Sequence, residues 1–343
     1  MNKPTVIVFF GGNSDTHDLS QETGYWMSTY ISRSKYRVVP VHITPEGLWQ
    51  VPLGALPQQG PVKRMMEMLF QSVRSLTPRQ GLERLLRHPV AALMTTVRGH
   101  GGDDGTLQRL GDALSIPVVG SSSATCHLAS HKDVCARQVD DIVATPYSLH
   151  FTDTDTEAKI IDDVDELLDF PLFVKPATAE GSSGVHLVQT LDELTPAIRS
   201  AKAQGDILVQ EKSPGSEVTV SIIEDSAGHR TVLPPTVIDA RQAPFYDHLA
   251  KRRAGRVGLH TSTDRDRLLQ EAQTVALDMF DKLKCRGYAS FDLTADNDHG
   301  ISLLEANTIP TFTSATPLPQ QLEAAHVHPA TMVDGLIGRT LQL

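Results

Sequence analysis

The sequence predicts an α/β fold of two or three packed lobes, of which the first is built on a parallel sheet. A chain of 343 residues, 40% of them hydrophobic, can bury more than one core. Over roughly the first 120 residues, strand-like apolar runs alternate with helix-like segments, which indicates a parallel α/β sheet. Later strand-like runs are joined by turn signals such as Pro214-Gly215. We therefore place the end of the first lobe near Gly120.

The first element is a strand over residues 6–10, a continuous run of β-branched and aromatic residues that is typical of a strand covered on both faces. Two glycines and an asparagine end this run. A helix is expected from Leu19 onward, with Ser14 or Asp15 as its cap. A secretory signal peptide is the alternative, but its apolar region needs about 7–15 residues, and this run is too short.

The other elements of the first lobe alternate between strands and helices. Strands are expected over residues 36–43, 89–96 and 118–119. A basic stretch at residues 61–88 is expected to be helical. A further helix is expected after a glycine-rich loop and should end near Leu114.

The second half of the chain is expected to contain short strands around one long irregular stretch. Helices are expected over residues 121–140, over the second half of the acidic segment 153–169, and over residues 263–284. Strands are expected at residues 171–175, 185–188, 207–211, 217–223, 288–293 and 301–305, the last two paired as a hairpin. Residues 238–262 are rich in charge and histidine and show no periodicity. An irregular segment of this length in a compact protein is usually a functional lid.

The composition argues against several classes of protein. The formal net charge is −10, with 31 basic and 41 acidic residues. An acidic chain without a basic run is a poor binder of nucleic acid or of membrane surfaces. No run approaches the ~20 apolar residues of a membrane span. Three cysteines without metal-site spacing argue against a disulfide framework, so we expect a reducing, cytoplasmic setting.

A lysine beside a run of small residues suggests a phosphate-binding loop. Lys175 ends an apolar strand, and Pro176 and the sequence Glu-Gly-Ser-Ser-Gly at residues 180–184 follow. Free backbone N–H groups in such a loop can surround phosphate oxygens, and the lysine supplies charge. The pattern is neither a P-loop nor a dinucleotide fingerprint. Taken alone, it fits the flexible tip of a β-hairpin equally well.

Three oxygen-bearing side chains near the C-terminus predict a magnesium site. Asp292 ends one predicted strand, and Glu305 and Asn307 lie on the next one. Two carboxylates and an amide that converge from paired strands form the all-oxygen site that Mg²⁺ prefers and shares with substrate phosphates. The alternative is a solvated strand end, but Glu305 directly follows an apolar run, where a core residue would be expected.

Several motifs follow one another along nearly the whole chain. They are Phe10-Gly11-Gly12 with His17-Asp18-Leu19-Ser20, the glycine-rich stretch at residues 101–108, Val174-Lys175-Pro176 with Gly181-Ser182-Ser183, Pro214-Gly215-Ser216-Glu217-Val218, Phe245-Tyr246-Asp247 with Ala250-Lys251, and Leu304-Glu305-Ala306-Asn307-Thr308. In this order they resemble the motifs of the D-alanine–D-alanine ligases, a family of ATP-grasp carboxylate–amine ligases. Any one of them would be weak evidence, whereas the ordered set is specific.

The resemblance implies an ATP-grasp fold of three lobes. These would be a parallel α/β substrate lobe at residues 1–120, a central ATP-grasp lobe at residues 121–212, and a C-terminal ATP-grasp lobe with the lid and the metal site at residues 213–343. It also implies an ATP-dependent ligase that joins two amino acids into a dipeptide, with ADP and phosphate as the other products. Phosphorylation would turn a carboxylate, which is a poor electrophile, into an acyl phosphate that an amine can attack. Metal ions and lysines would neutralise the charge that develops.

The same resemblance assigns roles to individual residues. ATP would be held by Lys132, Lys175, Gln210, Glu211, Lys212 and Glu217, and two Mg²⁺ (or Mn²⁺) ions by Asp292, Glu305 and Asn307. The catalytic and substrate-facing residues would be Asp18, Ser20, Ser182, Ser183, Lys251, Arg252 and Thr316. The implied partners are small-molecule amino-acid substrates and a second copy of the chain in a homodimer, with neither nucleic acid nor membrane.

The chain departs from the family pattern mainly on the substrate side. The family places an arginine two residues before the first metal carboxylate, where it steadies the oxyanion, and this position is Ser290 here. Thr311 replaces a glycine of the oxyanion hole, and Asp18 replaces a glutamate that meets the first amino group. Arg98 replaces a histidine, and Arg252 replaces a lid residue that is often aromatic.

Three interpretations of these departures remain open. The first is an ordinary cell-wall ligase in which Thr316 replaces a substrate-binding serine and Arg252 or Arg286 replaces the lost guanidinium. The second is a ligase of the same chemistry for other amino acids or carboxylates in specialised metabolism. The third is a degenerate ATP-binding regulatory protein, which the retained metal ligands disfavour. Arginines at positions 98 and 252 suit a carboxylate. We therefore expect weak D-alanyl-D-alanine synthesis, and a preferred substrate that carries a further anionic or strongly polar group.

Overall fold

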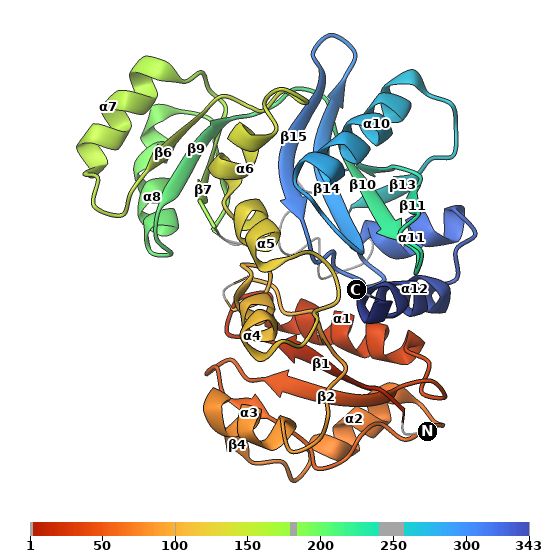
Figure 1. Ribbon diagram of the computed structural model, residues 1–343. Coiled ribbons are helices and arrows are strands. Elements are labelled where there is room, and N and C mark those ends of the chain that lie inside the picture. The colour runs from red at the N-terminus through yellow and green to blue at the C-terminus, as the bar shows by residue number, and fades with distance from the viewer. Residues whose placement is uncertain (1–2, 100, 179–183, 240–256, 343) are drawn as a thin grey trace.

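Three β-sheets organise the chain in the computed structural model, which describes residues 3–99, 101–178, 184–239 and 257–342. A five-stranded sheet belongs to the N-terminal part, a four-stranded sheet to the central part, and a six-stranded sheet to the C-terminal part. Figure 1 shows the three parts around a common centre, with helices α5 (Ser123–Ser130) and α6 (Lys132–Gln138) between them.

The N-terminal sheet has the strand order β4-β3-β2-β1-β5. Strand β1 (Thr5–Gly11) is wholly buried and pairs in parallel with β2 (Arg37–Ile43) and β5 (Ala92–Thr95), which confirms the predicted parallel sheet. Two short antiparallel strands, β3 (Trp49–Gln50) and β4 (Ser75–Leu76), extend it and were not predicted. The strand expected at residues 118–119 is reduced to a single parallel bridge between Leu93 and Val118.

Two predictions for the helices of this part are wrong. Helix α1 (His17–Tyr30) has Thr16, and neither Ser14 nor Asp15, at its N-cap position, without a side-chain capping bond; the hydroxyl of Ser14 donates to the carbonyl oxygen of Arg98 at 2.7 Å. The helical stretch expected over residues 61–88 is divided, because Thr77 starts a new helix through a capping box with Gln80. The helices are α2 (Val62–Phe70), α3 (Pro78–Leu85) and, as expected, α4 (Thr106–Leu114).

The central sheet is antiparallel, in the order β6-β9-β7-β8. Strands β7 (Leu172–Pro176), β8 (His186–Val188) and β9 (Ile207–Glu211) lie where they were expected, and β6 (Ser148–Phe151) was missed. Helices α7 (Glu157–Leu167) and α8 (Leu191–Lys202) supply apolar side chains to a core shared with this sheet.

The C-terminal sheet places β10 (Ser216–Glu224) next to β14 (Tyr288–Asp296), which pairs with β15 (Gly300–Asn307). The β14–β15 hairpin was predicted. The turn before β10 requires a glycine, since Gly215 has φ +90° and a Cβ there would lie 2.3 Å from the carbonyl oxygen of Ala295. The remaining elements are β11 (Arg230–Val232), β12 (Thr236–Asp239), β13 (Gly258–Thr261), α10 (Arg267–Lys282), α11 (Pro317–Ala324) and α12 (Pro329–Gln342).

The segment 238–262 is not irregular throughout, as the sequence suggested. Its two ends belong to β12 and β13, which pair antiparallel with Asp239 opposite Gly258. The predicted lid residues between them, including Lys251 and Arg252, lie outside the described residues, so the lid stays a prediction.

One hydrophobic core joins the N-terminal and C-terminal parts. Phe10 and Met27 of the first part belong to the same buried cluster as Tyr288, Phe312 and Leu336 of the last. This shared core fixes the carboxyl ends of β1 and β5 close to the end of β15. Within the described ranges, no helix combines the length and the apolar character needed to cross a membrane.

Candidate active site

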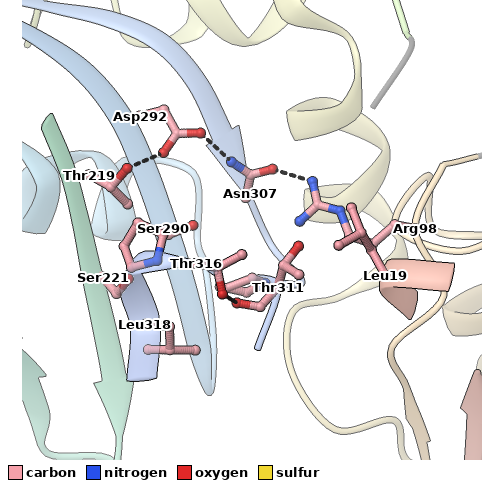
Figure 2. A pocket seen from close by; sticks show the side chains of 12 residues that line it. Leu19, Arg98, Thr219, Ser221, Ser290, Asp292, Asn307, Thr311, Thr316 and Leu318 are labelled. Atoms are coloured by element: carbon pink, nitrogen blue, oxygen red, sulfur yellow. Dashed lines mark hydrogen bonds between the residues drawn. The ribbon is translucent and has the colours of Figure 1, made fainter. Parts of the chain in front are cut away.

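A pocket lies where the turn after β5 meets the C-terminal sheet. Figure 2 shows its side chains converging from β10, β14 and β15, from the loop before α11, and from the N-terminal part. The residues that line it are Leu19, Arg98, Thr219, Ser221, Ser290, Asp292, Asn307, Pro310, Thr311, Thr316, Pro317 and Leu318.

The strand register puts six polar side chains on one face of the C-terminal sheet. One row across β10, β14 and β15 consists of Thr219, Asp292 and Glu305, and the next row consists of Ser221, Ser290 and Asn307. Residues two apart on a strand point to the same face, so both rows face the same side. The three predicted metal ligands are therefore brought together, and two of them, Asp292 and Glu305, lie directly opposite each other.

The amide of Asn307 connects these rows. Its Nδ2 donates to Asp292 Oδ2 at 3.2 Å, and the other oxygen of Asp292 accepts from the hydroxyl of Thr219 at 2.7 Å. Its Oδ1 accepts from the guanidinium of Arg98 at 2.6 Å. The dashed lines in Figure 2 follow this chain of hydrogen bonds from Thr219 to Arg98.

The donor set fits a magnesium ion that is shared with phosphates. Two carboxylates and an amide oxygen are hard ligands, and Mg²⁺ is commonly held by one or two carboxylates together with substrate phosphates and water. The Oδ1 of Asn307 has two lone pairs, so one can accept from Arg98 while the other stays available. Among the described residues, no group of three or more His, Cys, Asp or Glu side chains is arranged to hold a metal ion.

The two predicted phosphate-binding lysines lie beside this face. Lys132, the first residue of α6, forms an ion pair with Glu305 at 3.2 Å, and both side chains are largely buried. Lys175, at the end of β7, donates to the side-chain oxygen of Gln210 at 2.7 Å. Burial, and secondly the charge of Lys132, lower the pKa of Lys175 to about 7, whereas Glu305 acts in the opposite direction. The structure thus places two lysine side chains between the central and C-terminal sheets.

Three other residues of the predicted nucleotide site, Glu211, Lys212 and Glu217, lie on or next to strands β9 and β10. Glu211 accepts from the backbone N–H of Asp169 at 3.0 Å, and the backbone N–H of Lys212 donates to the carbonyl of Pro171 at 3.0 Å. Glu217 is half-buried on β10. Their contacts with adenosine stay predictions.

The predicted catalytic residues are only partly placed in the pocket. Asp18 is exposed in the first turn of α1, while Ser20 is fully buried and its hydroxyl accepts from the backbone N–H of Gly11 at 3.0 Å. Thr316 lines the pocket, but its hydroxyl makes three hydrogen bonds to the backbone of Thr311 and Thr313. Ser182, Ser183, Lys251 and Arg252 lie outside the described residues.

Two polar residues of the pocket, Thr219 and Ser221, were not predicted from the sequence. The signal was present, because polar residues alternate with apolar ones along β10 from Glu217 to Ser221, as on a strand with one face directed at a site. The hydroxyl of Ser221 is buried and has no hydrogen-bond partner among the residues that the structure describes. A buried hydroxyl without a partner costs about 1–3 kcal/mol, which a ligand that bonds to it would recover.

Arg98, which the sequence assigned to a substrate carboxylate, is already engaged by acceptors within the protein. The guanidinium is buried, but it already donates to the carbonyl oxygen of Ile309 at 2.8 Å and to Asn307, and it lies 3.6 Å from the carboxylate of Asp103.

The three cysteines are free and buried, and burial raises the pKa of Cys126 and of Cys135 to about 12, so neither acts as a nucleophile.

Comparison with known proteins gives a consistent result over the whole chain. A family model described as "D-ala D-ala ligase N-terminus" matches residues 5–121, and one described as "D-ala D-ala ligase C-terminus" matches residues 138–338. The D-alanine–D-alanine ligase of Chlorobium limicola is 28% identical, with 98% of this chain and 97% of that protein covered. The vancomycin/teicoplanin A-type resistance protein VanA of Enterococcus faecium is also 28% identical, with 98% of each chain covered.

Solved structures confirm the predicted ATP-grasp fold. The VanG D-Ala:D-Ser ligase of Enterococcus faecalis superimposes with a TM-score of 0.82 at 24% identity, covering 99% of this chain and 100% of its own. The D-alanine–D-alanine ligase of Coxiella burnetii gives a TM-score of 0.79 at 20% identity, covering 99% and 96%.

Proposed function

Because this chain belongs to the D-alanine–D-alanine ligase family, it is an ATP-dependent carboxylate–amine ligase, and we propose that it joins two amino acids of which one carries a polar side chain. The observation that carries this proposal is the face of the C-terminal sheet. There Asp292 and Glu305 lie opposite each other, beside Lys132 and next to a pocket lined with hydroxyl groups.

The proposed reaction has two steps. A carboxylate oxygen of the first amino acid attacks the γ-phosphorus of ATP, the bond to the ADP oxygen breaks, and an acyl phosphate forms. The amine of the second amino acid then attacks the acyl carbon and loses a proton, and phosphate leaves as the amide bond forms. Lys132 and Lys175 are placed to hold phosphate oxygens in both steps. Mg²⁺ held by Asp292, Glu305 and Asn307 would neutralise the charge on those oxygens.

The polar substrate is inferred from the side chains that line the pocket. Ser221 and Ser290 lie opposite each other on β10 and β14, and both line the pocket with Thr311. The unsatisfied hydroxyl of Ser221 suits a substrate with a hydroxyl or carboxylate group. The VanG ligase, which shares this fold, is named for D-Ala and D-Ser, so members of this fold are named for different second amino acids.

The experiment that tests this proposal is a screen of amino-acid pairs for ADP release, with mass spectrometry of the product. We expect pairs that contain a hydroxylated or acidic amino acid to be used at least about tenfold faster than D-alanine alone, since one hydrogen bond to a substrate group is worth about 1.4 kcal/mol. Equal or faster use of D-alanine alone would contradict the proposed preference for a polar substrate and would favour an ordinary cell-wall ligase.

We also propose a lobe division, a compartment and an oligomeric state for this protein. The division into lobes at residues 1–120, 121–212 and 213–343 agrees with the three sheets, each of which falls within one lobe. The free thiols suit a reducing, cytoplasmic compartment. A homodimer is proposed from the family resemblance, and the molecular mass in solution would test it.

A further inference from the structure

Arg98 connects two parts of the chain that are more than 200 residues apart. It follows β5 of the N-terminal sheet, yet its guanidinium donates through one terminal nitrogen to the carbonyl oxygen of Ile309 at 2.8 Å and through the other to Asn307 Oδ1 at 2.6 Å. Its Nε lies 3.6 Å from Asp103 Oδ2, in the same glycine-rich turn. The residue is 6% exposed, so these contacts are made away from bulk water.

The contact with Arg98 determines how the side chain of Asn307 is oriented. An amide has an acceptor end and a donor end, and a guanidinium can only donate. Arg98 therefore holds the oxygen of Asn307, which leaves the nitrogen to donate to Asp292 at 3.2 Å. A rotation of the amide by half a turn would set the amide nitrogen against the guanidinium and the amide oxygen against the carboxylate. Both of those contacts are repulsive.

Two acceptors in different directions explain why an arginine occupies this position. The planar guanidinium reaches a side-chain oxygen and a backbone oxygen at the same time, and a lysine nitrogen cannot reproduce this fork. The backbone of Arg98 is held as well, because its carbonyl oxygen accepts from the hydroxyls of Ser14 and Thr16 at 2.7 and 3.2 Å. Contacts within the N-terminal part thus hold the backbone of Arg98, while its guanidinium contacts the C-terminal strand.

The geometry points to Arg98 as a positioning residue for metal binding: it fixes the amide of Asn307 and couples the N-terminal glycine-rich turn to the metal strand. This inference rests on the proposed function, in which Asn307 and Asp292 bind Mg²⁺. Groups that orient a metal ligand typically contribute about 10–100-fold to metal affinity or activity. The metal affinity of this ligase therefore depends on a residue of the substrate lobe.

The test compares Arg98→Lys, which keeps the charge and loses the fork, with Arg84→Lys as the matched control. Arg84 also donates to a backbone carbonyl, that of Val51 at 3.0 Å, but within the N-terminal part alone. Binding of Mn²⁺ together with a non-hydrolysable ATP analogue is measured by electron paramagnetic resonance, without turnover. We expect Arg98→Lys to weaken Mn²⁺ binding by about tenfold or more, with a parallel rise in the KM for Mg²⁺. Arg84→Lys should leave both unchanged.

A second variant covers the case in which Arg98→Lys does not fold. The side chain of Asp103 accepts a hydrogen bond from the backbone N–H of Gly99 at 2.8 Å. Asp103→Asn keeps an oxygen for this bond and removes the charge beside Arg98. It should weaken Mn²⁺ binding in the same direction, by a few-fold. Unchanged or tighter Mn²⁺ binding in a folded variant would overturn the inference, even if its thermal stability fell. Failure of the unaltered protein to bind Mn²⁺ with the nucleotide would instead overturn the proposed metal site.

Discussion

The nucleotide side and the acceptor side of this active site are built differently. On the nucleotide side, the expected lysines contact the expected polar residues, Lys132 with Glu305 and Lys175 with Gln210. On the acceptor side, Ser290 lines the pocket at the position where the family pattern has an arginine, and the guanidinium of Arg98 is engaged by Asn307 and Ile309. We therefore propose that ATP handling follows the family pattern while the pocket for the second substrate departs from it.

The strongest test of the nucleotide side is Glu305→Gln. Removing the charge that faces Lys132 and is proposed to hold metal should lower turnover by roughly two or three orders of magnitude, since electrostatic stabilisation of the transferring phosphoryl group is lost. Steady-state ADP release measures this. Asp296→Asn, at a half-buried position at the far end of β14, is the control and should stay active. A Glu305→Gln protein as active as its parent would show that the metal assignment is wrong.

The acceptor side is tested by Ser221→Ala. The change should reduce the preference for a hydroxylated over an apolar substrate by about tenfold, as the loss of one hydrogen bond of roughly 1.4 kcal/mol predicts. It should also leave the ligand-free protein as stable or slightly more stable, because an unsatisfied hydroxyl is removed.

Ser28→Ala offers a matched control for this substitution. Its hydroxyl, on α1, is likewise buried without a partner among the described residues, but it does not line the pocket. Both variants should resemble each other in melting temperature, and only Ser221→Ala should change substrate preference. If the ratio of kcat/KM values is the same in the parent and in Ser221→Ala, this serine does not contact the substrate.

A smaller effect is expected from the protonation of Lys175. Its pKa of about 7 in the folded protein lies below the ordinary value of 10.5, because of burial and then Lys132. Between these values the unfolded chain binds more protons, so this group's contribution to stability rises with pH over that range. Phosphates bound beside Lys175 would restore its charge.

ATP binding at pH 8 should therefore take up a proton, to a maximum of about one. Calorimetry in two buffers of different ionisation enthalpy measures this uptake, and Lys175→Gln should abolish it. Uptake that persists in Lys175→Gln would assign the proton to another group.

Much of this fold follows from local patterns in the sequence. The buried run of β1 and the hairpin of β14 and β15 have strong periodic or turn signals, and both are found as expected. The two-residue strands β3 and β4 carry too few residues for any period; β3 forms on the edge of β2, and β4 on the edge of β3. β12 and β13 were missed because they pair across a long intervening stretch.

The residues of the site could be predicted from the sequence only where they belong to local motifs. The set of Asp292, Glu305 and Asn307 was found because its residues lie on adjacent strands of one hairpin. The contact between Arg98 and Asn307 depends on the packing of two lobes, which no local pattern encodes. For the same reason the sequence assigned Arg98 to a substrate carboxylate, whereas its guanidinium donates to Asn307 and to the carbonyl oxygen of Ile309.

The central claim, ligation through an acyl phosphate, is tested most directly by oxygen transfer. The first amino acid is supplied with ¹⁸O in its carboxylate, together with ATP, Mg²⁺ and the second amino acid, and the released phosphate is examined by mass spectrometry. The proposed reaction predicts one ¹⁸O atom in each phosphate, and one dipeptide formed for each ADP. Phosphate without ¹⁸O, or ADP release that does not depend on any pair of amino acids, would contradict the assignment of this chain as a dipeptide ligase.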